Sequence, residues 1–237
     1  MLRESYIKPS YALSCILPSL LLTLLVFQAG TVAYAQVAPK PPTLHTTLRN
    51  AQVWDELDFS DVQDFEDATR GFIAGLESPR WIANDNTTLT QQGFYAWNME
   101  AYLSFMDGVT CPPSVNPSLW RQETLNNLNG LFEVLPGSIY QIRSYDMATM
   151  SFVKAPHGWI VIDPLMSRET SRAGLALFRV HVSQDPIVAI IITHSHHDHY
   201  NGVPGILQAE AKASTPPGGD LNSMATIPIY APEGFFT

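Results

Sequence analysis

The sequence predicts a mixed α/β fold, of α+β class, from three observations in its second half. Pro186 to Ile192 is a short, β-branched and uncharged run, which favours a fully buried strand over a helix. Trp159 to Ile162 is typical of a second buried strand. Ser167 to Val180, between these strands, has the start signal and the inward apolar residues of a helix. Strand, helix and strand in this order indicate an α/β unit.

The composition limits the class of protein. At 237 residues the chain is long enough for one domain of ordinary size with an extension. Apolar residues make up 46% and charged residues 15%, as in a globular protein rather than a disordered one. The formal net charge of −9 and the lack of a basic stripe exclude nucleic acid as a partner. An anionic substrate still fits this charge if bound metal ions supply local positive charge.

Residues 1–35 are predicted to be a cleaved signal peptide. Arg3 and Lys8 give a positive start, residues 16–27 form an apolar core, and residues 33–35 (Ala-Tyr-Ala) make a small-x-small cleavage site. The alternative is a membrane anchor, but the core is shorter than the ~20 residues that a span needs. We therefore expect a secreted or periplasmic protein with no stable membrane span after cleavage. Cys111 would then be the only cysteine, so no internal disulfide could form.

Residues 36–130 are expected to form an N-terminal extension that is partly helical. An acidic cluster in residues 55–67 is interpreted as a solvated face, because the alternative, a calcium site, lacks the glycine and terminal glutamate of an EF-hand. The aromatic-rich residues 94–106 are expected to pack as an amphipathic helix. Ser118 is expected near the N-cap of a helix from Leu119 to Leu128.

Residues 131–237 contain the predicted sheet. Residues 139–143 alternate between apolar and polar, and residues 150–154 are expected to pair with them in a hairpin. The expected elements that follow are a strand at 159–162, a helix to about 180, a strand at 186–192, a helix at 203–212 and a strand at 227–231.

The loop behind the strand 186–192 is the predicted metal site. His194 and His196 alternate in an extended stretch, so they face the same side, and two imidazoles at this spacing can hold one zinc ion at ~2.0–2.1 Å. Asp198 and His199 follow where the chain turns and can face a second ion ~3.5–4 Å away. His197 should point away from the ions. A solvated turn is the alternative, but crowded imidazoles and carboxylate without a metal would be costly.

The motif His194-x-His196-x-Asp198-His199 behind an apolar strand resembles the signature of the metallo-β-lactamase superfamily. The flanking segments resemble those of the alkyl sulfatase group, the hydrolases of dodecyl sulfate and similar detergents. The resemblance covers about residues 70 to 237 and includes the segments 116–122, 130–134, 139–143, 158–165 and 229–234.

This resemblance implies an αββα sandwich, with residues 131–237 forming the first half of the metallo-β-lactamase domain. It implies two zinc ions, held by His194 and His196 and by Asp198 and His199, and a water that Asp198 orients as the catalytic residue. Asp163, at the end of the strand 159–162, would orient a ligand without itself binding metal. The substrate would be an alkyl sulfate, and the full-length protein a homodimer.

The resemblance also implies further metal ligands and sulfate-binding residues beyond residue 237. The chain is therefore expected to be an N-terminal part of a longer enzyme and to be inactive alone. Two other interpretations stay open: another hydrolase of the same fold, such as a lactonase, thioesterase or β-lactamase, and an inactive metal-binding fragment.

Overall fold

The computed structural model describes residues 40–78, 80–106, 110–214 and 225–235. The predicted signal peptide, residues 1–35, lies outside the described residues. The chain divides into a unit of residues 1–41 and a unit of residues 42–237, and every element below belongs to the second. Among the described residues, no helix has both the length and the apolar character to cross a membrane.

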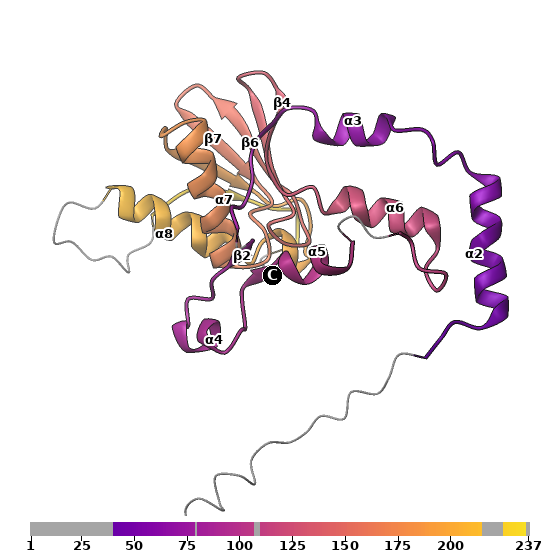
Figure 1. Ribbon diagram of the computed structural model, residues 1–237. Helices are drawn as coiled ribbons and strands as arrows, with labels where there is room; N and C mark the ends of the chain where they lie inside the picture. The colour runs from indigo at the N-terminus through magenta and orange to yellow at the C-terminus, as the bar shows by residue number, and fades with distance from the viewer. Residues whose placement is uncertain (1–39, 79, 107–109, 215–224, 236–237) are drawn as a thin grey trace, which may run out of the picture. The chain divides into compact units, whose positions relative to one another are not determined.

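A mixed sheet of seven strands organises this unit, in the order β1-β4-β5-β6-β7-β8-β9 (Figure 1). The pairs from β1 through β7 are antiparallel, whereas β7, β8 and β9 are parallel neighbours. The strand bounds are β1 Phe72–Ala74, β4 Gly130–Leu135, β5 Ile139–Arg143, β6 Met150–Ala155, β7 Gly158–Ile162, β8 Ile187–Ile191 and β9 Ile229–Tyr230. The predicted hairpin of residues 139–143 and 150–154 is thus confirmed as β5 and β6.

Two helices of the same unit contribute to the core beneath the sheet. Helix α7, Arg168–His181, connects β7 to β8, and Ser167 caps it in a capping box with Thr170. Helix α8, Val203–Ser214, follows the predicted metal loop, which itself contains a short 3-10 helix, η1, at His197–His199. The predicted helix after Ser167 and the helix beginning at Val203 are therefore both confirmed.

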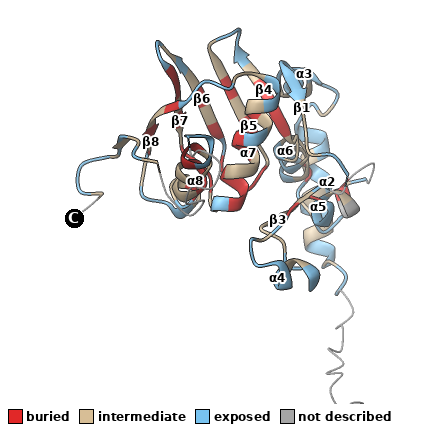
Figure 2. Cartoon of the chain, turned by 90° about the vertical axis from the view of Figure 1, so that its left-hand side faces the viewer, coloured by how far each residue is buried: buried red, intermediate tan, exposed pale blue. Residues whose placement is uncertain are grey.

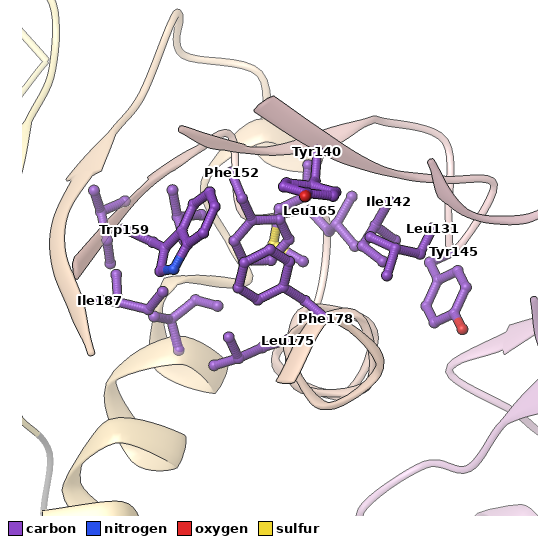
Figure 3. Packing of buried hydrophobic residues seen from close by; sticks show 14 of the residues in the cluster. Leu131, Tyr140, Ile142, Tyr145, Phe152, Trp159, Leu165, Leu175, Phe178 and Ile187 are labelled. Carbon is purple, nitrogen blue, oxygen red and sulfur yellow. The ribbon is translucent and has the colours of Figure 1, made fainter. Parts of the chain in front are cut away.

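The core lies between the sheet and α7, and aromatic rings fill it (Figure 3). The ring of Phe178 on α7 stacks on Phe152 with centroids 4.0 Å apart and meets Trp159 edge-on at 5.0 Å. Such ring pairs contribute about 0.5–1.5 kcal/mol beyond the area that they bury. Buried residues accordingly gather on the strands and on α7 (Figure 2). The alternation predicted for residues 139–143 is real, since Tyr140 and Ile142 are the buried members.

The opposite face of the sheet is also apolar, yet only half-buried. Val153 lies between Ile139 and Ile160, and Ile162 lies beside Ile191. All of these side chains are intermediate in exposure. One sheet with helices on one face and a second apolar face is the arrangement expected for one half of an αββα sandwich, so the predicted fold class is confirmed.

The segment before β4 contains short elements whose details differ in part from the expectation. The remaining elements are α2 Leu44–Glu56, α3 Gln63–Thr69, β2 Trp81–Ile82, α4 Thr87–Gln91, β3 Trp97–Asn98, α5 Glu100–Met106 and α6 Pro117–Asn126. Trp97 and Asn98 pair with β2, so the helix expected over residues 94–106 begins only at Glu100. Asn116, not Ser118, caps α6, because its side chain accepts hydrogen bonds from the Ser118 and Leu119 amides.

Strand β1 was not foreseen from the sequence. It pairs with β4 at the edge of the sheet, with Phe72 opposite Phe132, and so joins part of the expected extension to the main sheet. The division into an extension of residues 36–130 and a domain of residues 131–237 stays a prediction.

Candidate metal centre

The predicted metal loop lies at the carboxyl ends of two parallel strands. Ile162 of β7 is the register partner of Ile191 of β8, so both strands end at the same edge of the sheet. Asp163 follows the first strand and residues 193–199 follow the second. Ligands of α/β proteins gather at this edge. Two separate segments thereby bring their polar side chains to one place.

Asp163 contacts both ends of the metal loop, at Thr193 and at His199. Its side chain is buried, with 7% of the residue exposed. One carboxylate oxygen, Oδ1, accepts a hydrogen bond from the Thr193 amide at 2.8 Å. The other, Oδ2, accepts one from the Thr193 hydroxyl at 2.6 Å and lies 2.9 Å from Nδ1 of His199. One carboxylate therefore contacts both the start and the end of the loop, and the role of Asp163 in orienting a ligand stays a prediction.

The three predicted histidine ligands lie together. The ring centroid of His194 is 4.6 Å from that of His196 and 4.0 Å from that of His199. Nδ1 of His194 lies 2.9 Å from the Thr193 hydroxyl, and Nε2 of His199 lies 3.3 Å from the Asp198 carboxylate. Both nitrogens of the His199 ring therefore face carboxylates.

His197 is placed apart from this cluster. It is exposed, and its ring meets Tyr200 edge-on at 5.5 Å. No ligand role was predicted for it. It provides a neighbouring histidine with which the members of the cluster can be compared.

Asp163, His194 and His199 form the group best arranged for one ion, since a donor atom from each lies within 4.8 Å of the others. Imidazole nitrogen and carboxylate oxygen are the donors that zinc takes in proteins, so the residues present fit this metal. The sequence assigned Asp163 to orienting a ligand and assigned His196 and Asp198 to binding. Those individual roles stay predictions. The five side chains, Asp163, His194, His196, Asp198 and His199, all lie at the same edge of the sheet.

The turn that carries Asp163 is strained. Asp163 and Leu165 have φ angles of 52° and 68°, which non-glycine residues seldom adopt. The amide of Leu165 bonds back to the carbonyl of Asp163 at 2.8 Å, and the Leu165 carbonyl accepts from the Gly202 amide at 2.9 Å. A Cβ added at Gly202 would lie 1.8 Å from the Pro164 carbonyl oxygen. Glycine after the metal loop therefore permits this close approach.

Sequence reasoning missed two residues at this edge. Thr193 directly precedes the motif and was given no role, although its hydroxyl bridges Asp163 and His194. Asp146, in the connection between β5 and β6, is 4% exposed and binds the segment that follows Asp163. Burial raises the pKa of Asp146, hydrogen bonds from Met166, Thr170 and Ala148 oppose that rise, and the charge of Asp198 adds to it. No local pattern distinguishes Asp146 from an ordinary turn residue.

Comparison with known families identifies this edge. Residues 145–226 match the Metallo-beta-lactamase superfamily, and this range includes Asp163 and the whole metal loop. Residues 145–226 of the chain carry a metallo-β-lactamase domain. It is 38% identical over 92% of its length to a linear primary-alkylsulfatase from Pseudomonas sp., of which it covers 29%. It is 39% identical over 83% of its length to an (R)-specific secondary-alkylsulfatase from Pseudomonas sp., of which it covers 26%.

Two further comparisons agree. The chain is 38% identical over 80% of its length to the alkyl/aryl-sulfatase BDS1 of Saccharomyces cerevisiae, of which it covers 26%. Its structure resembles that of the stereoselective inverting sec-alkylsulfatase Pisa1 from Pseudomonas sp., with a TM-score of 0.66 and 39% identity over 83% of this chain and 28% of the other. The predicted resemblance to alkyl sulfatases is confirmed, and the chain spans less than a third of the length of these relatives.

Proposed function

We propose that this chain supplies the metal-binding edge of a metal-dependent hydrolase that converts alkyl sulfate esters to alcohol and sulfate. The observation that carries the proposal is the cluster of Asp163, His194 and His199, whose donor atoms lie within 4.8 Å of one another at the carboxyl ends of β7 and β8. This cluster places one histidine from each proposed ligand pair beside Asp163. The sulfatase relatives support sulfate esters as the substrate class over lactones, thioesters or β-lactams. Linear alkyl sulfates such as dodecyl sulfate are the proposed substrates.

We assign separate roles in metal binding and in orienting water to the residues of the loop. His194 and His196 would hold one zinc ion, and Asp198 and His199 the second. When bound, two zinc ions supply positive charge and lower the pKa of water to about 7. Asp198 is half-buried at the edge of the cluster, so its carboxylate can accept a hydrogen bond from the attacking water and orient it. Asp163 would keep the His199 ring in place through Nδ1, which leaves Nε2 for metal.

The 237-residue chain alone is proposed to be inactive toward alkyl sulfates. A two-ion site needs ligands on both sides of each ion, and the loop provides one side. Because the chain covers only 26–29% of its sulfatase relatives, the remaining ligands and the groups that bind sulfate would come from the rest of a longer protein. Homodimer formation and a secreted or periplasmic location are part of the same proposal.

Zinc titration of the metal-free chain tests the site directly. His194→Ala should lower zinc affinity by at least about 10-fold, because a ligand is removed, whereas His197→Ala should leave it unchanged. His197 is a matched control, since it lies in the same loop but contacts Tyr200. Equal affinities for the two variants would place the metal elsewhere.

The sulfatase activity requires a second experiment. The full-length natural protein should release sulfate from dodecyl sulfate, and a chelator should abolish that release. Sulfate release by the 237-residue chain, lost in His194→Ala, would contradict the proposed incompleteness. Turnover of a lactone or a β-lactam by the full-length protein, without sulfate release, would assign it to another branch of the superfamily. Zinc binding with no turnover of any of these substrates would favour an inactive metal-binding protein.

A further inference from the structure

Asp146 lies outside the predicted metal loop but at the same edge of the sheet. It belongs to the connection between β5 and β6, and the register places that connection beside the end of β7, because Met150 pairs with Ile142 and Ser151 pairs with Ile162. Oxygen Oδ1 of Asp146 accepts a hydrogen bond from the Ala148 amide at 2.9 Å. Oxygen Oδ2 accepts from the Met166 amide at 2.8 Å and from the Thr170 hydroxyl at 2.7 Å.

A carboxylate at this position is unusual because no cation compensates it. Among the described residues, no Lys, Arg or His forms an ion pair with Asp146. Removing a carboxylate from water without a counter-charge is costly, and hydrogen bonds from neutral donors recover only part of that cost. The three hydrogen bonds tie Asp146 to its own loop, to the segment after Asp163 and to the first turn of α7.

The hydrogen bonds hold the strained turn that carries Asp163. The positive φ angles of Asp163 and Leu165 persist only if the surroundings fix them. Three contacts do so: the fully buried side chain of Leu165 (Figure 3), the bond from the Gly202 amide to the Leu165 carbonyl, and the bond from the next amide, that of Met166, to Asp146. Asp146 also holds the first turn of α7 through Thr170.

The conformation of this turn fixes the position of the Asp163 carboxylate. Both of its oxygens are used by the metal loop, through Thr193 and His199. The Thr193 hydroxyl continues this contact to Nδ1 of His194. A displacement of the turn would therefore reach histidines on both sides of the loop.

We propose that Asp146 is a positioning residue for the metal centre, acting through Met166 and Thr170 on the Asp163 turn. The inference rests on the proposed metal site and extends it to a residue that touches none of the ligands by hydrogen bond. If Asp146 only stabilised the fold, its removal would lower the unfolding temperature and leave the loop intact.

Glu210 offers a matched control for that distinction. It is a buried carboxylate, 5% exposed, that also accepts a backbone amide, that of Ile187, and contacts the opposite end of α7 through Arg179. Asp146→Asn and Glu210→Gln therefore each replace a buried carboxylate with an amide, at the two ends of one helix, and only Glu210 has a cation partner. Ala148 and Met166 bond to different oxygens of Asp146, and asparagine replaces one of these oxygens with an NH2 group, so it cannot accept from both amides in this geometry.

The experiment is a zinc titration of the metal-free 237-residue chain, with the unfolding temperature of each variant measured beside it. Asp146→Asn should weaken zinc binding by about 10-fold or more, as loss of an orienting partner does elsewhere. Glu210→Gln should lower the unfolding temperature with zinc affinity within about twofold of the original. Thr170→Ser should keep the original affinity, and Thr170→Val should lose affinity in the direction of Asp146→Asn. Equal zinc affinity in Asp146→Asn and the original chain would overturn the inference.

A second readout needs no metal. Hydrogen exchange of the Thr193 amide reports its bond to Asp163, and it should accelerate in Asp146→Asn and Thr170→Val but not in Glu210→Gln. If the original chain binds no zinc, the proposed metal site fails, and the Thr193 exchange rates still decide the positioning role. Unchanged exchange in both Asp146→Asn and Thr170→Val would overturn that role whatever the metal does.

Discussion

The two ends of the β7–β8 pair differ in whether their carboxylates have cationic partners. At the amino end, carboxylates meet cations: Arg179 pairs with Glu210, and Lys154 pairs with Asp185 at 2.7 Å. At the carboxyl end, Asp146, Asp163 and Asp198 have no Lys or Arg partner among the described residues, and their neighbours are imidazoles, hydroxyls and amides. One end is neutralised by its own side chains, whereas the other has unbalanced negative charge and imidazole donors. A bound cation would supply the missing charge.

The largest expected effect is on stability at the amino end. Arg179→Ala leaves Glu210 buried without its cation, and removal of one partner of a buried pair costs about 3 kcal/mol or more. Urea unfolding should show this loss, while zinc affinity stays unchanged. The double variant Arg179→Met with Glu210→Gln should recover much of the stability. A fall in zinc affinity in Arg179→Ala would show that the two ends are coupled.

Next in size is an effect on metal binding at the carboxyl end. Asp163→Asn replaces an oxygen that contacts Thr193 and His199 with an amide group, so zinc affinity should fall about 10- to 100-fold. Calorimetric titration at fixed pH measures this change. The loss of unfolding free energy should be smaller than in Arg179→Ala. Retained affinity would mean that Asp163 neither binds nor orients at this site.

A smaller effect concerns pH. Burial holds the pKa of Asp146 above its ordinary value of 3.8, so the folded chain binds this proton more tightly than the unfolded chain. Stability from this group is therefore fully present below the unfolded pKa and is lost as pH rises through the folded pKa. Asp146→Asn should flatten the fall in unfolding free energy above about pH 4. Identical slopes for the two chains in urea unfolding at several pH values would contradict this assignment.

The smallest effect is expected for the exposed pair at the amino end. Asp185→Asn removes the partner of Lys154 but leaves its ammonium over the Trp159 ring, 4.7 Å from the centroid. Both partners are more than a third exposed, so the loss should be below about 0.5 kcal/mol and should vanish at high salt. A loss of unfolding free energy that is larger and independent of salt would show that the Lys154–Asp185 pair is not an ordinary exposed ion pair.

The sequence predicted the elements whose signals are local. The alternation of residues 139–143, the apolar run of β8 and the Ser167 cap each depend on neighbours a few residues apart, and all three were confirmed. Strand β1 could not be predicted, because its three residues are half-exposed or exposed and form a strand only by pairing with β4. Local signals also misled at α6, where Asn116 and Ser118 are both good caps and the loop geometry selected Asn116.

In the candidate site, too, residues with a local sequence signal could be predicted, whereas residues that depend on distant contacts could not. His194, His196, Asp198 and His199 could be predicted as ligands because they follow one strand in a fixed spacing. Asp163 was predicted only through resemblance to a family, since it lies 36 positions before His199 in the chain. Asp146 was not found at all, because its partners Met166 and Thr170 lie 20 and 24 residues along the chain. Contacts of this kind exist only after the sheet has formed, so the sequence around each residue does not signal them.

The order of the strands has a consequence for folding kinetics. Strands β4 to β7 form an antiparallel meander whose neighbours are also close in sequence, whereas β8 reaches β7 only after α7 has crossed over. Contacts between distant residues form slowly, because the intervening chain must first be ordered. The meander should therefore gain protection early in refolding, and the loop at Thr193 late. Because the loop forms late, bound zinc should lower the unfolding rate of the native protein more than it raises the rate of the first folding steps.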